Sequence, residues 1–354
     1  MSRESRVGRA LWPALMLVLL AHAVSDLLHH PFLGDTGDAA TVDAHLTLWV
    51  PGTEAGGPSE AVARQAAASL QLTGRPATVK VLRQGGAAGA VTRFLGDEPG
   101  HARPADLLVV SSATVADLAR GRSDAVFGGV ATAAGDAEEA LRAARPVAVL
   151  AEDELQLAVR PASRVRSGAQ LAHELSRRPR AHLVAIEGDA WTKAQLGRLV
   201  QRAGVSGRVA YRAYPSGAEA ALGLAAGEAD VVLAPRSELQ AEVAAGHLRV
   251  LRWPSRDGVA PRAWTALVEA SGLKPGQHAR VRDELARLAD DPQWRRALRA
   301  AGRAVPEAGT ARAVRAARAA RAARGATAVP RGFFARRVAE ATWLQRVTAG
   351  LEGG

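Results

Sequence analysis

The chain contains 354 residues, of which 48% are hydrophobic and 23% are charged, and it has no cysteine. This apolar content suffices for a sizeable core, the length corresponds to about two domains, and the lack of cysteine excludes disulfide scaffolds, thiolate metal sites and cysteine catalysis. The net charge of +11 comes from the chain ends: residues 295–354 hold 13 arginines against three glutamates, so the body is close to neutral and its composition excludes a nucleic-acid-binding domain.

Residues 1–23 are typical of a secretory signal peptide. Arginines in MSRESRVGR precede an apolar run from Ala10 to Leu20 and a small-x-small tripeptide at 21–23. The run is shorter than the roughly 20 apolar residues of a membrane span. We therefore expect an exported protein, periplasmic or at the cell surface, with an uncleaved N-terminal anchor as the alternative. Residues 24–44 are predicted to be a linker in which His29 and His30 are solvated, so no metal site is expected.

The body alternates short apolar strand patterns with Ala- and Leu-rich helical patterns. Strands are predicted at 45–50, 77–82, 106–111, 146–151, 155–159, 181–186, 208–214, 229–234 and 248–253. Helices are predicted near 59–72, 114–121, 167–178, 191–203, 217–226 and 236–246. After Trp264 the pattern turns helical, with helices predicted at 275–289, 291–301, 308–323 and 332–349. This alternation predicts an α/β fold with a parallel or mixed sheet that is covered on both faces.

Residues 312–325, RAVRAARAARAARG, form a low-complexity segment. Arginines at every third position spiral around a helix and do not form one stripe. Two interpretations are open. The segment is either a patch that contacts an anionic membrane surface or a polyphosphate, or a solvated helix, which Ala and Arg both favour.

Three stretches, taken in order, resemble the solute-binding proteins of tripartite tricarboxylate transporters (the Bug family). They are LTLWVPGTEAGGPSEAVARQAAASL (46–70), VKVLRQGGAAGAVTRFL (79–95) and VAYRAYPSGAEAALGLAAGEADVVLAPRSELQAEVAAGHLRVLRW (209–253). Downstream, residues 262–273, 290–302 and 333–350 resemble the closing segments of the family. The resemblance thus covers about residues 45–350, essentially the whole chain after the linker.

This resemblance implies a periplasmic-binding-protein-like (type II) fold, in which two α/β lobes enclose a ligand cleft and a helical C-terminal segment packs on the first lobe. Lobe one would comprise residues 45–150 plus 254–354, and lobe two residues 151–253. The chain would cross between the lobes near 148–153 and 250–256. The implied partners are a small carboxylate ligand and the membrane permease subunits of a tripartite tricarboxylate-type transporter.

Apart from the family, three loops that join a strand to a helix suit an anionic ligand. Unpaired N–H groups at a helix N-terminus converge on one point, and glycines let a ligand approach the backbone. Hydroxyls that follow other strands lie where open α/β sheets bind ligands. The expected ligand-binding residues are Gly56, Gly57, Ser59 and Glu60 in loop one, Gly85 and Gly86 in loop two, Gly188, Asp189, Trp191, Thr192 and Lys193 in loop three, and Ser111, Ser112, Tyr214 and Ser216 after other strands.

Loops one and three depart from the family pattern. Glu60 stands where the family usually has Asp, and it lies either in the cleft or in the first turn of a helix as an ordinary acid. Lys193 stands where the family has His, and it either attracts a carboxylate or is solvated. Asp189 would repel a bound carboxylate. Trp191 either stacks on the ligand or packs between the lobes.

The sequence therefore predicts an extracytoplasmic solute-binding protein that captures a small carboxylate for a permease and needs no cofactor. The alternative is a degenerate family member that acts as an anchored sensor or interaction protein, which is favoured if Asp189 and Trp191 fill the cleft. An enzyme is not expected, because the sequence has no nucleophile elbow, His-Glu-x-x-His pair, Walker-type loop or dinucleotide motif.

Overall fold

The computed structural model describes residues 46–51, 57–72, 74, 77–82, 86–95, 106–119, 126–127, 130–131, 134–144, 146–205, 209–255, 257–269, 275–304 and 333–341. The predicted signal peptide (1–23), the linker (24–44) and the Arg-rich segment (312–325) lie outside these residues. None of the described helices is both long enough and apolar enough to cross a membrane.

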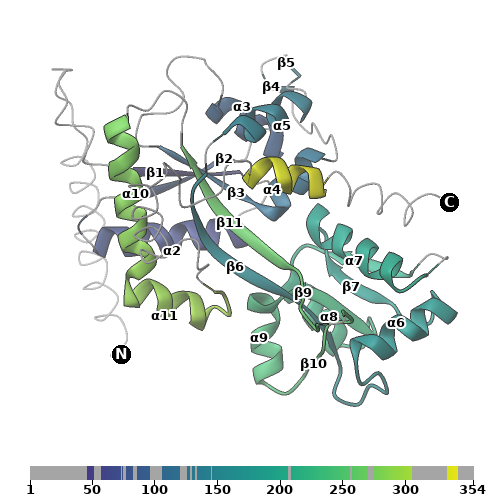
Figure 1. Ribbon diagram of the computed structural model, residues 1–354. Helices are drawn as coiled ribbons and strands as arrows, with labels where there is room; N and C mark the ends of the chain where they lie inside the picture. Colours follow the sequence, from purple (N-terminus) through teal and green to yellow (C-terminus); the bar gives the residue numbers. More distant parts are fainter. Residues whose placement is uncertain are drawn as a thin grey trace, which may run out of the picture. The chain divides into compact units, whose positions relative to one another are not determined.

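The elements follow one another along the chain as alternating strands and helices, with a helical C-terminal part (Figure 1). They are β1 (Leu46–Pro51), α2 (Pro58–Leu72), β2 (Ala77–Leu82), α3 (Gly86–Leu95), β3 (Leu107–Ser111), α4 (Ser112–Ala119), β4 (Val126–Phe127), β5 (Val130–Ala131), α5 (Ala134–Ala143), β6 (Pro146–Val159), α6 (Gly168–Arg177), β7 (Val184–Glu187), α7 (Ala190–Arg202), β8 (Tyr211–Tyr214), α8 (Gly217–Ala225), β9 (Val231–Pro235), α9 (Arg236–Ala244), β10 (Arg249–Leu251), β11 (Arg262–Glu269), α10 (Pro275–Asp290), α11 (Pro292–Ala300) and a helix over 333–341.

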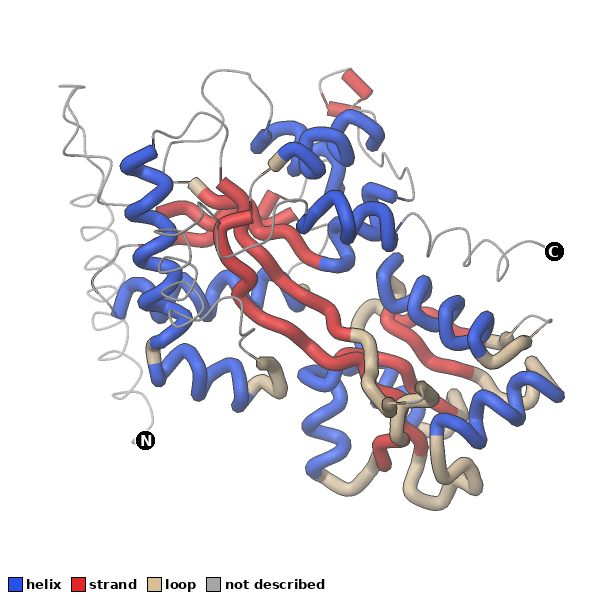
Figure 2. The backbone as a smooth tube through the Cα atoms, viewed as in Figure 1, coloured by secondary structure: helices blue, strands red, loops and turns tan. Residues whose placement is uncertain are grey.

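Nine of the described strands form one mixed sheet in the order β2-β1-β3-β11-β6-β9-β7-β8, with β10 paired to β6. β1, β2 and β3 run parallel, and so do β7, β8 and β9. Between these two parallel groups, β11 pairs antiparallel with β3 and β6, and β6 pairs antiparallel with β9. Figure 2 shows the two long central strands running from one group to the other.

The longest strand, β6, belongs to both groups. Its residues 146–154 pair with β11, and its residues 155–159 pair with β9 and β10. The sequence predicts two strands here, because Glu152, Asp153 and Glu154 interrupt the apolar pattern. The strand continues through them because the start of β11, residues 262–264, pairs with these three residues.

The prediction that the chain is helical after Trp264 is wrong for β11. This strand fills the gap between β3 and β6, and every residue from Trp264 to Glu269 is buried. A continuously apolar stretch does not by itself distinguish a buried strand from a buried helix. The two neighbouring strands decide the outcome, because without β11 their backbone N–H and C=O groups would have no partner.

Two helices, α3 and α5, are missing from the sequence prediction. The α3 helix begins at Gly86, within the Gly- and Ala-rich stretch that was interpreted as a loop. It buries Ala88, Ala90, Val91 and Phe94 on one side. Burial of this apolar face outweighs the low helix propensity of glycine, as is usual for helices in globular proteins.

Helices cover both faces of the sheet, which confirms the predicted α/β fold. One face of the β1–β3 group packs on α2, α10 and α11, and the other face packs on α3, α4, α5 and the helix over 333–341. In the β7–β9 group, α6 and α7 cover one face, and α8 and α9 cover the other. Helix starts are fixed by side-chain caps at Ser167, Asp189, Ser216 and Asp291.

Candidate functional site

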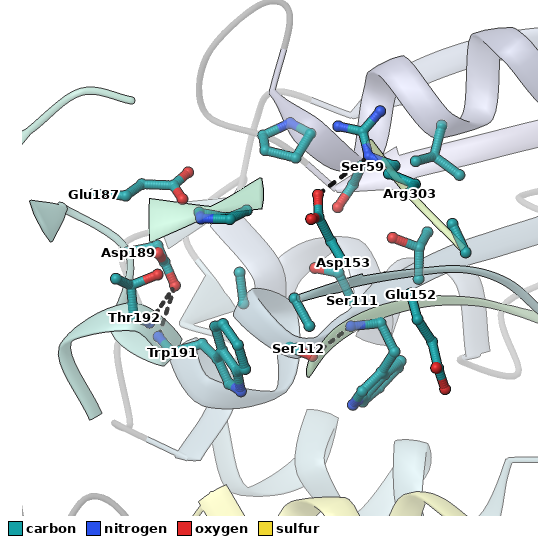
Figure 3. Close-up of a pocket in the computed structure, with 18 residues that line it drawn as sticks. Ser59, Ser111, Ser112, Glu152, Asp153, Glu187, Asp189, Trp191, Thr192 and Arg303 are labelled. Carbon is teal, nitrogen blue, oxygen red and sulfur yellow. Dashed lines mark hydrogen bonds and ion pairs between the residues drawn. The ribbon is translucent and has the colours of Figure 1, made fainter. Parts of the chain in front are cut away.

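A cavity of about 90 Å³, which we call the acidic cavity, lies where strands of both parallel groups end (Figure 3). The start of α2, the end of β3 with the start of α4, the end of β7 with the start of α7, and the end of β9 contribute to its wall. The middle of β6, the start of β11 and Arg303 complete it. The carboxyl ends of sheet strands are where open α/β folds place their ligands, so this position marks a candidate binding site.

The N-terminus of α7 lies at this cavity, and a carboxylate of the protein itself already binds its N–H groups. Asp189 is the N-cap residue, and its Oδ1 accepts hydrogen bonds from the N–H groups of Trp191 (2.7 Å) and Thr192 (3.0 Å). The positive end of the helix dipole stabilises this carboxylate further. The α7 N–H groups that loop three was expected to offer to a ligand are therefore used within the protein.

Glu187 stands at the end of β7, next to Asp189, and its surroundings favour the protonated form. Burial, chiefly, and the negative charges of Asp189, Glu238 and Asp153 raise the pKa of Glu187 to about 9, and a hydrogen bond with Asp189 acts in the same direction. A protonated carboxyl can donate this bond, whereas two ionised carboxylates repel each other. Glu187 is therefore neutral at pH 7.

Asp153, in the middle of β6, forms an ion pair with Arg303, and both side chains are 10% exposed. Its Oδ2 lies 3.4 Å from Nε of Arg303, and its Oδ1 accepts a hydrogen bond from the N–H of Ser237 at 3.2 Å. Arg303 is held there because Ala304 and Glu152 exchange two backbone hydrogen bonds of 2.9 Å. Burial raises the pKa of Asp153, and the bonds from Ser237 and the charge of Arg303 oppose this rise only in part.

The two serines after β3 are engaged in holding the local structure. Ser111 and Thr114 bond reciprocally, each side-chain oxygen accepting from the other residue's N–H at 3.2 Å. Ser112 Oγ accepts a hydrogen bond from the N–H of Trp264 at 3.0 Å, which ties the start of α4 to β11. By contrast, Thr192 is fully buried in the cavity wall, and its Oγ1 has no hydrogen-bond partner in the described part of the chain.

The structure brings six of the fifteen expected ligand-binding residues to the acidic cavity. They are Ser59, Ser111, Ser112, Asp189, Trp191 and Thr192. Their contact with a ligand stays a prediction. Gly56 and Gly85 lie outside the described residues.

The other expected residues do not line the acidic cavity and have structural contacts elsewhere. Glu60 is buried in the first turn of α2 and forms an ion pair with Arg64, and its two interpretations stay predictions. Lys193 Nζ lies 5.2 Å from the ring centroid of Tyr211. Gly57 precedes α2, Gly86 begins α3 at φ +55°, Gly188 donates its N–H to Tyr214 O, Tyr214 Oη donates to Glu228, and Ser216 caps α8.

The charged residues that give the cavity its character are not among those predicted from the sequence. Asp153 lies where the sequence predicts a break between two strands, although β6 continues through it. Glu187 is the last residue of β7, and the sequence pattern indicates a ligand site in the loop after this strand. Arg303 follows α11, 150 positions after Asp153, and nothing in the sequence pairs the two. A carboxyl residue at the end of an apolar strand was the available signal for Glu187.

A second cavity, which we call the arginine-lined cavity, shares Ser112, Glu152, Trp191 and Trp264 with the first. It measures about 390 Å³. Four arginines reach it from α7, β11 and the helix over 333–341, against three carboxylates. These are Arg198, Arg202, Arg262 and Arg337, and Glu152, Asp257 and Glu340. Ion pairs join Arg198 and Arg337 to Glu340 and Arg262 to Glu152.

The sheet order and the position of the cavity define a periplasmic-binding-protein-like fold, the fold of the extracytoplasmic solute-binding proteins. Solved structures with this fold include MatC from Rhodopseudomonas palustris with bound malate (18% identity, TM-score 0.59, 85% of this chain and 98% of that chain). A TctC solute-binding protein from Polaromonas (17%, 0.61, 86% and 98%) and the periplasmic binding protein BugD (17%, 0.58, 87% and 98%) are similar. No family model and no curated protein matches the sequence significantly. The resemblance seen in the sequence is thereby confirmed for the fold.

Proposed function

We propose that this protein is an extracytoplasmic solute-binding protein that captures a small metabolite in the acidic cavity and delivers it to a membrane permease. The observation that carries the proposal is a small cavity at the carboxyl ends of strands from both parallel groups. The fold is shared over nearly the full length of MatC, a protein whose structure holds malate.

The expectation of a small carboxylate solute and a tripartite tricarboxylate-type permease belongs to this proposal. Malate in MatC supports the carboxylate by analogy of fold. Hydrogen bonds to a charged group contribute about 1.5–3 kcal/mol each, and micromolar affinity requires about 8 kcal/mol. Three to five such bonds would suffice.

The predicted lobes, residues 45–150 plus 254–354 and residues 151–253, are part of the same proposal. Both would contribute to the cavity wall, with Ser59, Ser112 and Arg303 from lobe one, and Asp153 and Thr192 from lobe two. Opening and closing about the crossings near 148–153 and 250–256 would convert solute occupancy into a shape that a permease can recognise.

A degenerate protein without a solute is the second candidate. The observation that would favour it is a cleft filled by Asp189 and Trp191. Both residues line the cavity, yet about 90 Å³ stay open, because the Asp189 carboxylate turns back to the N–H groups of α7. This geometry supports the solute-binding candidate over the degenerate one.

The test is a thermal-shift screen of the whole chain against small carboxylates, amines and neutral analogues, followed by calorimetry of each hit. Ala113→Phe narrows the acidic cavity from α4 and should abolish binding. Ala241→Phe places the same side chain on an exposed position of α9 and should leave binding unchanged. Hits that survive Ala113→Phe, or a complete lack of hits, would count against solute capture in this cavity.

A further inference from the structure

We infer that the solute bound in the acidic cavity carries a protonated amine. This inference rests on the proposed capture of a small solute in that same cavity, and it assigns the solute an amine in place of the carboxylate that the fold of MatC supports by analogy. It replaces an anion-recognising cavity, which the strand–loop–helix patterns of the sequence predict, with a cation-recognising one.

The charges of the cavity wall lead to this inference. Carboxyl groups of Asp153, Glu187 and Asp189 line it, and a fourth lining carboxylate, Glu152, is paired with Arg262 at 3.2 Å. Among the described lining residues, Arg303 is the one cation, and it forms an ion pair with Asp153. A carboxylate solute would enter a space already rich in negative charge, whereas an ammonium group would reduce the repulsion among the acids.

Two backbone donors at the start of α7, where the sequence predicts an anion site, are committed to another bond. The Trp191 and Thr192 N–H groups donate to Asp189, and Ser111 is engaged with Thr114. A carboxylate can accept hydrogen bonds but cannot donate them, so it gains nothing from these two N–H groups.

An independent observation points to a hydrogen-bonding group on the ligand. Thr192 is fully buried in the cavity wall, and no group in the described residues bonds to its Oγ1. Buried hydroxyls are normally hydrogen-bonded, so an orphaned one marks a missing partner. An ammonium group has three N–H donors and no acceptor, and it can serve Thr192 Oγ1 and two carboxyl groups at once. No cluster of three potential metal ligands occurs among the described residues, so a metal ion is a poorer match.

The protonation of Glu187 gives the inference a measurable consequence. The groups that face Glu187 are Asp189 at the start of α7, Glu238 on α9 and Asp153 on β6, with Arg303 behind Asp153. Burial, chiefly, and the three acids among these four groups raise the pKa of Glu187 to about 9. An ammonium group beside Glu187 favours its ionised form, so binding of the amine releases a proton.

Size and polarity restrict the solute further. The rest of the wall is apolar, with Val62, Ala113, Ala151 and Ala263 among its residues. A cavity of about 90 Å³ with such a wall suits a short aliphatic chain that carries the amine.

The experiment is calorimetry of the whole chain at pH 7.5 with three four-carbon probes, namely 1,4-diaminobutane, 1,4-butanediol and succinate. Each titration is run in two buffers of different ionisation enthalpy, so that proton release is counted directly. We expect binding of the diamine alone, with release of up to one proton per solute bound.

Two variants separate recognition from folding. Glu187→Gln keeps the shape and the hydrogen bond to Asp189 but cannot ionise, so it should abolish proton release and weaken the diamine about 10- to 100-fold. Thr192→Val removes only the orphaned hydroxyl, and it should weaken the diamine several-fold while proton release persists. The matched control Glu219→Gln, on α8 away from the cavity, should behave like the parent chain.

Each result decides the question. Diamine binding with proton release that Glu187→Gln abolishes supports the inference. Succinate binding without diamine binding overturns it and leaves the solute-binding proposal standing. No heat with any of the three probes overturns it as well, and the wider screen with Ala113→Phe then decides the proposed function separately.

Discussion

The acidic cavity and the arginine-lined cavity share Trp191 and Trp264 but have opposite chemistry. The acidic cavity is small, and its wall combines buried carboxyl groups with apolar side chains. The arginine-lined cavity is about four times larger, and its charges are partly exposed and paired with one another. The same charge has a different effect in each, because a buried carboxyl shifts its pKa whereas an exposed pair is screened by water.

This contrast shows what a strand–loop–helix pattern establishes. It locates a ligand site at the end of a strand, but it does not determine the sign of the ligand's charge. Loop three illustrates the point, since Asp189 supplies internally the anion that the α7 N-terminus was expected to bind from solution. Substitutions can test this contrast in two ways: by removing the side chain that separates the two cavities, or by changing the charged residues of one cavity.

Removing the shared wall should have the largest effect. Trp264 is 5% exposed and packs against Phe333 and Phe334 at ring-centroid distances of 5.2 and 6.0 Å. Trp264→Ala should lower the free energy of unfolding by about 3–5 kcal/mol, because it leaves a hole between the two cavities. Urea denaturation followed by far-UV circular dichroism measures this loss. Leu72→Ala, at a position that is 72% exposed, should stay within about 0.5 kcal/mol of the parent chain.

The acidic cavity should make the free energy of unfolding depend on pH, through Glu187. The folded chain holds a proton on Glu187 up to about pH 9, whereas the unfolded chain loses it near the ordinary glutamate value of 4.5. The free energy of unfolding should therefore fall as pH rises between these values, by at most about 1.4 kcal/mol per pH unit for this group. Glu187→Gln should make the fall shallower between pH 5 and 8.5. Parallel curves for the two chains would show that Glu187 is not buried in its protonated form.

The cap of α7 should matter for both stability and selectivity. Asp189→Ala removes two hydrogen bonds to helix N–H groups and should cost about 0.5–2 kcal/mol. Ser216→Ala is the matched control, because Ser216 caps α8 with a bond of 3.1 Å to Glu219 N and lies away from the cavity. Urea denaturation should give similar losses for both variants. Only Asp189→Ala should make succinate bind more tightly, since it opens the α7 amides to the cavity, and equal succinate affinities would contradict this role of Asp189.

The smallest effect is expected in the arginine-lined cavity. Arg198 and Glu340 approach to 3.3 Å with side chains that are 26% and 39% exposed. A double-mutant cycle of Arg198→Met and Glu340→Gln should give a coupling energy of about 0–1 kcal/mol that declines with added salt. A coupling well above this range that is insensitive to salt would mean that this cavity is as shielded from water as the acidic one.

Local patterns predicted most of the fold. The apolar runs that became β1, β2, β3 and β9 lie close to their predicted positions, and so do α2, α10 and α11. The misses depended on packing that no local pattern records. Neighbouring strands on both sides make β11 a strand, and burial of Ala88, Val91 and Phe94 makes a helix of the Gly-rich stretch at 86–95. The predicted lobe boundaries and the signal peptide stay predictions.

The candidate site was predicted in place but not in chemistry. Residues after β3 and β7 were expected at the ligand, and Ser112, Asp189 and Thr192 do line the cavity. The charge of the cavity depends on Asp153 and Arg303, which meet only because the backbone of residue 304 pairs with that of residue 152. Such a long-range contact has no signature in the sequence of either segment.

A crystal structure of the whole chain with 1,4-diaminobutane tests the central claim, capture of a small amine where the two parallel groups of strands end, most directly. The account predicts electron density for the solute in the acidic cavity, with one ammonium group within hydrogen-bond distance of Glu187 and Thr192 Oγ1. Density confined to the outer surface, or a cavity occupied by the Trp191 side chain instead, would contradict it.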